Sequence, residues 1–145
     1  MIAFREMKQE DLSAVAALEK ELFSDNWSEK SIGETLEQEN SFCFVAEDNE
    51  GVCGYLLVYY VLDECEIARI GVSPKMRRQG IASFLLHELV MFCHAYSMNK
   101  ILLDVREGNA GARSFYQRNG FKEDGIRKNF YENPKEHAVL MSRML

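Results

Sequence analysis

Hydrophobic and polar positions follow two different periods along the chain, and the change of period predicts the elements. Between residues 12 and 23 the apolar side chains recur every three or four positions, the spacing of an amphipathic helix with one buried stripe. Ser28 then stands where a helix cap belongs, and Ile32 and Leu36 form the buried edge of a second, shorter helix. A short strand over residues 2–7 is predicted before both helices.

The period changes to two from Ser41 onward. Phe42, Phe44 and Ala46 alternate with other residues in one strand, and the polar turn after it leads into a long apolar strand over residues 52–62. A third strand over residues 64–72 follows directly. Three consecutive strands joined by short turns predict an antiparallel meander.

The second half of the chain alternates helices and strands. A helix after Gln79 has an apolar face made of Ile81, Phe84, Leu85, Leu89, Phe92, Cys93 and Tyr96. A mostly apolar strand over residues 100–106 is of the kind that lies inside a sheet, and Asn109 begins a further helix that Asn119–Gly120 ends. Residues 121–131 and 138–145 read as a final hairpin.

The predicted order is therefore β-α-α-β-β-β-α-β-α-β-β, an α/β fold whose mixed sheet has helices on both faces. A length of 145 residues suffices for one compact domain, so residues 1–145 are expected to form a single domain. Hydrophobic residues at 47% and charged residues at 28% are typical of a globular protein.

Charge and cysteine usage narrow the class further. A net charge of −6 argues against a general nucleic-acid binder and suits either a basic partner or simple solubility. No signal peptide is evident, and the longest mostly apolar run, residues 54–62, is far too short to span a membrane. Cys43, Cys53, Cys65 and Cys93 have no paired spacing and read as reduced, buried thiols. A cytoplasmic protein without a metal site is expected, since His87 and His94 lack a third partner at ligand spacing.

The stretch from Glu66 to Leu86 carries the most informative chemistry. It reads as a strand that ends near Val72, a loop with Arg77, Arg78, Gln79 and Gly80, and then a helix. Backbone N–H groups, the positive end of a helix dipole and two guanidinium groups converge there, which predicts a phosphate-binding pocket. An ordinary helix start with a solvated basic patch is the alternative.

This loop also carries a family resemblance. Arg77–Ala82 (Arg-Arg-Gln-Gly-Ile-Ala) resembles the Gln/Arg-x-x-Gly-x-Gly/Ala signature of the GCN5-related N-acetyltransferases (GNAT). Residues 103–106, Asn109, Tyr116 and Asn119–Phe121 resemble the later strand-helix unit of that family. The resemblance covers essentially the whole chain. It implies a GNAT fold with about seven strands and about four helices, and a sheet that splits between the fourth and fifth strands.

The resemblance implies acetyl-CoA as co-substrate and assigns the residues that bind it. The loop would bind the pyrophosphate, and the strand before it would bind the pantetheine arm and the thioester. Asn109 would also bind the pantetheine region, although it can equally serve only as a helix cap. The set comprises Ile70, Gly71, Val72, Arg77, Arg78, Gln79, Gly80, Ile81, Ala82 and Asn109. The backbone N–H of Val72 would additionally stabilise the developing oxyanion.

The resemblance also implies the acid and base. Tyr116 would protonate the departing CoA sulfur, the alternative being a buried ring with its hydroxyl bound to the backbone. Asp104 stands where related alanine acetyltransferases carry a glutamate base, and Glu66 matches the base position of other members. Both carboxylates remain candidates, as does a water-mediated route. Phe130 and Tyr131 are interpreted as hairpin core, and Trp27 as core in preference to a substrate groove.

Four short segments, at residues 27–30, 61–64, 104–109 and 126–131, resemble the branch of the family that acetylates the N-terminal alanine of a small-subunit ribosomal protein. We therefore expect direct acetyl transfer to a protein N-terminus in a ternary complex, without direct nucleic-acid or membrane partners. Two alternatives stay open. One is an acetyltransferase for lysine or a small amine, and the other is a catalytically silent acyl-CoA sensor.

Overall fold

The computed structural model describes residues 1–76 and 78–145, so Arg77 of the predicted phosphate loop lies outside the described residues. The strands are β1 (Ala3–Glu6), β2 (Ser41–Asp48), β3 (Gly51–Val61), β4 (Glu64–Val72), β5 (Lys100–Arg106), β6 (Lys122–Tyr131) and β7 (Glu136–Met144). The α-helices are α1 (Leu12–Leu22), α2 (Glu29–Leu36), α3 (Ile81–Ala95) and α4 (Ala110–Arg118), and short 3-10 turns occupy Gln9–Asp11 and Pro74–Met76. The predicted order of elements is confirmed.

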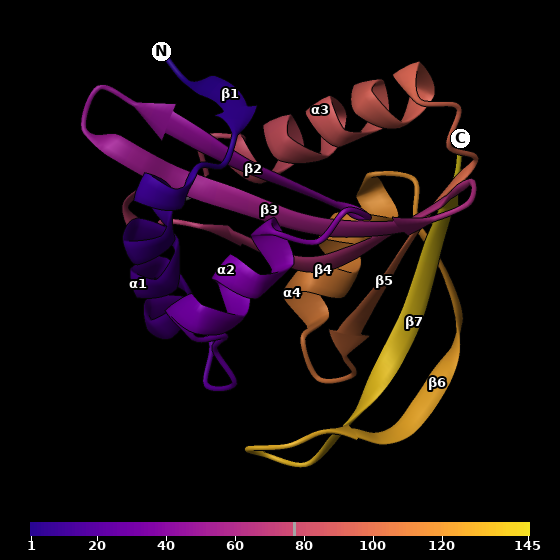
Figure 1. Cartoon of the computed structure of the whole chain (residues 1–145). Coiled ribbons are helices and arrows are strands. Elements are labelled where there is room, and N and C mark those ends of the chain that lie inside the picture. Colours follow the sequence, from indigo (N-terminus) through magenta and orange to yellow (C-terminus); the bar gives the residue numbers. More distant parts are fainter. Residues whose placement is uncertain (77) are drawn as a thin grey trace.

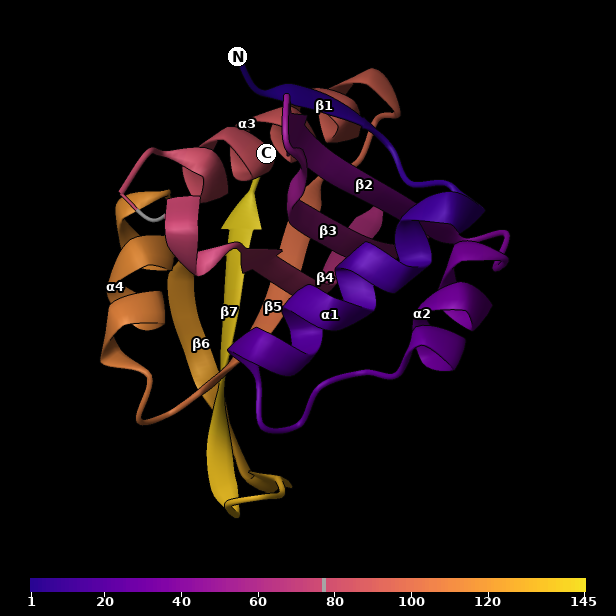
Figure 2. The same cartoon turned by 90° about the vertical axis from the view of Figure 1, so that its left-hand side faces the viewer.

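The seven strands form one mixed sheet in the order β1-β2-β3-β4-β5-β7-β6. β1 to β4 pair antiparallel in sequence, which confirms the predicted meander, and β6 and β7 form the predicted final hairpin. Helices α1 and α2 cover one face of the sheet, and α3 and α4 lie on the other (Figures 1 and 2). The α/β architecture with helices on both faces is therefore as predicted.

The sheet splits in its middle, between β4 and β5. The two strands are parallel and pair only over Glu64–Glu66 and Lys100–Leu102. Beyond these three residue pairs β4 runs on to Val72 beside β3, and β5 runs on to Arg106 beside β7. The expected split between the fourth and fifth strands is confirmed, and it leaves one backbone edge of each strand facing the gap.

Two hydrophobic cores hold the helices to the sheet. The larger lies under α3 and α4 and the smaller under α1 and α2. In α3 the buried positions include Ile81, Leu85, Leu89 and Cys93, as the pattern predicted, but Leu86 is buried as well and Tyr96 is 61% exposed. Tyr96 lies just beyond the end of the helix and stacks on Phe92 from outside, which is why the periodic pattern overextends the buried face.

Local capping chemistry explains where several helices begin and end. The Ser28 hydroxyl accepts a hydrogen bond from the Ser31 N–H, and the Asn109 side chain accepts one from the Ala112 N–H, so both predicted caps are confirmed. Gly120 ends α4 with φ of 88°, the left-handed conformation that glycine adopts without a steric penalty. All four cysteines are free and buried, as predicted.

Candidate active site

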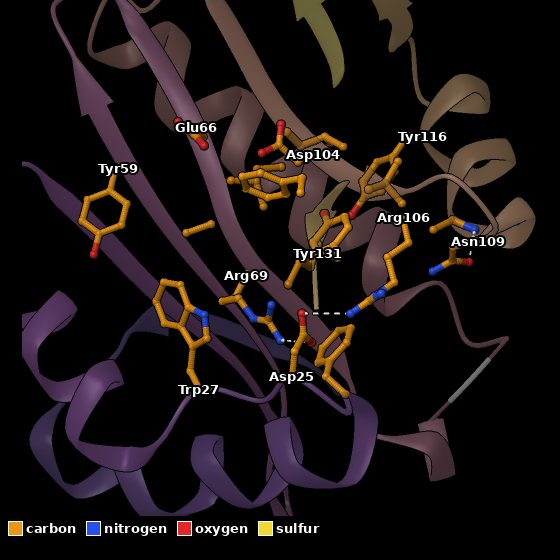
Figure 3. Close-up of a pocket in the computed structure, with 18 residues that line it drawn as sticks. Asp25, Trp27, Tyr59, Glu66, Arg69, Asp104, Arg106, Asn109, Tyr116 and Tyr131 are labelled. Atoms are coloured by element: carbon orange, nitrogen blue, oxygen red, sulfur yellow. Dashed lines mark hydrogen bonds and ion pairs between the residues drawn. The ribbon is translucent and has the colours of Figure 1, made fainter. Parts of the chain in front are cut away.

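A pocket of about 590 Å³ opens where β4 and β5 separate (Figure 3). Its walls come from both strands, from the α1–α2 loop, from the start of α4 and from the end of β6. The lining residues are Phe23, Asp25, Trp27, Tyr59, Glu66, Ile67, Ala68, Arg69, Ile70, Leu103, Asp104, Val105, Arg106, Asn109, Ala112, Tyr116, Phe130 and Tyr131. Residues that the sequence analysis singled out as catalytic candidates, Glu66, Asp104 and Tyr116, thus share one cavity.

The two carboxylates face the pocket from neighbouring strands. Glu66 is the last residue of β4 that pairs with β5, and Asp104 lies two residues beyond its pairing partner, Leu102. Partial desolvation raises the pKa of the Glu66 carboxyl, and the negative charge of Asp104 raises it further, while Arg127 opposes both effects. Desolvation likewise raises the pKa of Asp104, again opposed by Arg127. Both carboxylates therefore bind a proton more readily than they would in water, which suits a general base.

Tyr116 enters the pocket from α4. Its ring is 8% exposed and packs edge-on against Phe115 and Phe121. The hydroxyl points into the cavity toward Tyr131 (Figure 3). Burial, with a smaller contribution from Tyr131, raises the pKa of Tyr116 well above its ordinary value, so the phenol keeps its proton at neutral pH. The geometry is that of a proton donor held on a rigid helix.

Tyr131 also faces the cavity, although the sequence analysis interpreted it as hairpin core. An irregularity in the β6–β7 pairing between Arg127 and Tyr131 redirects the end of β6. Asn129 adopts a positive φ of 52° inside it, and the Asn129 N–H donates to Nδ1 of His137 at 2.9 Å. Burial and the charge of Asp104 raise the pKa of Tyr131 to about 12, so it too is neutral at physiological pH. Phe130, also interpreted as hairpin core, lines the pocket as well and is 43% exposed, so the interpretation of both residues as hairpin core is wrong.

Trp27, interpreted from the sequence as a core residue in preference to a groove residue, belongs to both surroundings. It packs against the smaller core and at the same time lines the pocket. Its backbone N–H donates to the buried Glu19 carboxylate at 2.9 Å, which fixes the course of the α1–α2 loop. The loop is therefore a firm wall of the cavity.

An arginine-carboxylate network, which the sequence analysis missed, crosses the pocket (Figure 3). Arg69 pairs with the fully buried Glu19, with Nη2 to Oε1 at 2.8 Å, and its guanidinium lies over the rings of Phe23 and Trp27. Asp25 lies between Arg69 and Arg106, at 3.6 and 3.5 Å. These residues come from segments far apart in the sequence, and alternation alone would have put Arg69 on the other face of β4 from Glu66.

A β-bulge explains the position of Arg69. On β4, Ile67 pairs with Val58 of β3 and Arg69 with Leu57, so Ala68 is the extra residue. The bulge turns Arg69 onto the same face as Glu66, three positions earlier. An isolated alanine between an isoleucine and an arginine gives no sequence signal for a bulge. The position of Arg69 could therefore not be predicted from the sequence pattern.

Several of the residues expected to bind the co-substrate lie along the open side of the gap or at the start of α3. Ile70 lines the pocket, and residues 70–72 have no strand beside them on the β5 side. Gly80, the residue before α3, has φ of 74°, and a side chain added there would meet no atom within 4 Å. Arg78 and Gln79 are exposed beside it. The loop is therefore open at the start of α3.

Packing against Tyr55 explains why position 71 holds a glycine, independently of any ligand. A Cβ at this position would lie 2.6 Å from Cζ and 2.7 Å from Cε1 of Tyr55. The Tyr55 ring is fully buried, and its hydroxyl donates to Glu19, so the ring has no freedom to move aside. β4 can therefore pass this close to Tyr55 only with glycine at position 71.

We predict that Gly71→Ala lowers the free energy of unfolding by about 1–3 kcal/mol, the usual consequence of overpacking a core. Gly125→Ala on β6 is the matched control, because a Cβ there would meet nothing within 4 Å. Urea denaturation of both variants measures the difference. Equal stability of the two variants would contradict the prediction.

Comparison with known proteins identifies the family. The model of the acetyltransferase (GNAT) family matches residues 12–121. The chain belongs to the GNAT family. It is 31% identical over 140 residues to a Bacillus subtilis protein provisionally named ribosomal protein bS18-alanine N-acetyltransferase, covering 96% of this chain and 93% of that protein. It is also 31% identical over 134 residues to the Escherichia coli ribosomal protein bS18-alanine N-acetyltransferase, covering 91% and 90%.

The three-dimensional comparison agrees with the sequence comparison. The crystal structure of the Escherichia coli ribosomal-protein-S18-alanine N-acetyltransferase superposes with a TM-score of 0.92 at 29% identity, covering 99% of this chain and 94% of that one. The GNAT fold is confirmed, and with it the acyltransferase class of the chain. Members of this family use acetyl-CoA as the acyl donor.

Two further observations concern ligands and location. Within residues 1–76 and 78–145, no three His, Cys, Asp or Glu side chains are grouped so that they could hold a metal ion. Among the helices of the same residues, none has the length and apolar character needed to cross a membrane.

Proposed function

We propose that this GNAT protein transfers the acetyl group of acetyl-CoA to the N-terminal α-amine of a protein, namely the N-terminal alanine of ribosomal protein bS18. The observation that carries the proposal is the single cavity in which Glu66, Asp104 and Tyr116 meet at the split of the sheet. The acceptor is proposed from the relatives named for bS18-alanine acetylation, which match more than nine tenths of the chain. Residues 1–145 would act as one catalytic domain.

The described residues fit the proposed co-substrate. Ile70, Gly71 and Val72 would pair their free backbone edge with the pantetheine arm, as an added strand would. The N-terminus of α3, from Arg78 to Ala82, would donate N–H groups to the pyrophosphate, where Gly80 leaves room for close approach. Asn109 lines the pocket at the start of α4 and would reach the pantetheine in addition to capping the helix. Acetyl-CoA would supply the activated acetyl group.

The protein residues would then manage two protons. Glu66 would accept a proton from the acceptor ammonium, directly or through one water molecule, which exposes the nitrogen lone pair. Asp104 would lie beside the ammonium and hold it before transfer. As the new N–C bond forms and the C–S bond breaks, Tyr116 would give its hydroxyl proton to the sulfur. The nitrogen would lose its second proton as it becomes an amide, and that proton would restore the Tyr116 hydroxyl. The Val72 N–H would stabilise the carbonyl oxygen. Transfer would be direct, without a covalent acetyl-enzyme, a proposal supported by the absence of cysteine among the described residues that line the cavity.

The chemistry of the site suits an α-amine. An α-amine has a reference pKa near ~8 and a lysine near ~10.4, so at neutral pH the α-amine presents roughly 200-fold more of the neutral, reactive form. An α-amine therefore needs less help from a base than a lysine amine does. The net charge of −6 also favours encounter with a basic ribosomal protein.

We predict that a basic peptide beginning with alanine is acetylated on its α-amine at least about 100-fold faster than a lysine in the same peptide with a blocked N-terminus, as the amine pKa values imply. Mass spectrometry of the products, with spermidine as a small-amine competitor, measures the preference. Faster acetylation of lysine or of spermidine would contradict the α-amine as acceptor and indicate a lysine or small-amine acetyltransferase instead. Tight CoA binding without transfer to any amine would indicate a sensor.

A further inference from the structure

The sheet consists of two well-paired halves joined by a short seam. β4 pairs with β3 as far as Val72, and β5 pairs with β7 as far as Arg106, whereas β4 and β5 share only three residue pairs. On the α3 side a continuous core connects the halves. A small rotation about the seam would change the width of the β4–β5 gap on the other side, where the pocket opens.

Asp25 lies across this gap. One carboxylate oxygen is 3.6 Å from Nη2 of Arg69 on β4, and the other is 3.5 Å from Nη2 of Arg106 on β5 (Figure 3). Among the described residues, no other side chain forms ion pairs with both strands. Arg69 and Arg106 lie three and four residues beyond the seam, roughly 10–13 Å from it at the rise of an extended strand.

Each arginine is fixed independently within its own half. Arg69 is held by the fully buried Glu19 at 2.8 Å. Arg106 donates to the backbone oxygens of Glu132 and Pro134, both at 2.8 Å, and pairs with Glu136 at 3.2 Å. Each guanidinium group therefore moves with its own half of the sheet. An attraction between Asp25 and both groups draws the two halves together across the gap.

We propose that Asp25 is a positioning residue that holds β4 and β5 at the separation that admits the pantetheine arm of the acyl-CoA. The proposal rests on the proposed binding of CoA in this gap. The contacts of Asp25 are longer than those that fix the arginines, and its side chain is 29% exposed. They therefore suit an attraction that limits the width of the gap more than a rigid connection between the strands. A Coulombic attraction falls off slowly with distance, so it persists when the gap widens slightly, whereas a hydrogen bond would be lost.

The alternative role for Asp25 is to fix the α1–α2 loop alone. That loop already has its own attachments, because the Trp27 N–H donates to Glu19 and the Ser24 hydroxyl donates to the Asn133 oxygen at 3.0 Å. Since Phe23, Asp25 and Trp27 of this loop line the pocket, a loop-fixing role would alter binding of the acceptor there and would leave the gap unchanged. The two roles are therefore separable by which substrate is affected.

We expect Asp25→Asn, which keeps the shape and removes the charge, to weaken CoA binding and raise KM for acetyl-CoA about fivefold, with a smaller change in kcat. Isothermal titration with CoA and steady-state kinetics in both substrates measure this. Asp25→Glu keeps the charge and is expected to recover at least half of the lost affinity. Glu123→Gln is the matched control, since it removes an ion pair with Arg113 and neither of these residues lines the pocket.

An unchanged CoA affinity in Asp25→Asn, or a rise confined to KM for the acceptor peptide, would overturn the proposal. So would an Asp25→Glu variant as weak as Asp25→Asn, because charge would then not matter. Hydrogen exchange of the cofactor-free protein gives a reading that does not depend on the proposed function. Amides of the seam, residues 64–66 and 100–102, are expected to exchange faster in Asp25→Asn than in Glu123→Gln, and equal rates would also overturn it. Wild-type protein that binds no CoA would instead defeat the proposed function.

Discussion

Replacing Tyr116 by phenylalanine is expected to lower kcat about 100-fold or more, the usual contribution of a positioned general acid, while the affinity for CoA changes little. The hydroxyl is the only group that the substitution removes, and it points into the cavity from a ring that is 8% exposed and packed between Phe115 and Phe121. The ring will therefore stay in place. Single-turnover kinetics and CoA titration separate the chemical step from binding.

Tyr131→Phe is the control for this experiment. Its hydroxyl also faces the cavity, but its ring is held from another element, with the Arg106 guanidinium 4.5 Å from the ring centroid. If Tyr116 is the acid, loss of the Tyr131 hydroxyl will have the smaller effect on kcat. A Tyr116→Phe enzyme with wild-type kcat, or one that loses CoA affinity in proportion to rate, would remove Tyr116 from the proton-transfer step.

The fold could be predicted from the sequence because its determinants are local. The three- and four-residue spacing of α1 and α3, the alternation of β2 and the caps Ser28 and Asn109 all depend on neighbours within a few positions. The prediction of the buried face of α3 was less accurate at the end of the helix. Periodicity cannot tell whether the next element covers a side chain, and Tyr96 is left uncovered.

The site was only partly predictable because half of its walls depend on long-range packing. Glu66, Asp104 and Tyr116 were found through the family resemblance of their surroundings. Arg69 was missed because the bulge at Ala68 reverses the alternation of β4, and Asp25 because its partner Arg106 is 81 residues away. Such contacts exist only after the sheet, the α1–α2 loop and the β6–β7 hairpin have assembled.

Glu66→Gln is expected to lower kcat/KM about 100-fold or more, the scale of general-base catalysis, and to remove the limb of the pH profile on which activity rises from the acid side. That limb reports the pKa of the base, which in this pocket is raised above the ordinary glutamate value by desolvation and by the charge of Asp104. Below its raised pKa Glu66 is protonated and cannot accept the amine proton. Above it, the remaining ionisation is that of the acceptor amine near ~8.

Asp104→Asn distinguishes the two carboxylates by the direction of a pH shift. If Glu66 is the base, the substitution removes a negative neighbour and leaves Arg127 facing Glu66, so the pKa of Glu66 falls and the limb moves to lower pH. Activity at neutral pH then drops only through weaker binding of the ammonium. If Asp104 is the base, the same substitution abolishes the limb, and Glu66→Gln keeps it. The pH profiles of kcat/KM for the two variants therefore assign the base by opposite outcomes. If the acid limb keeps its position in both variants, neither carboxylate is the base, and a water-mediated route remains.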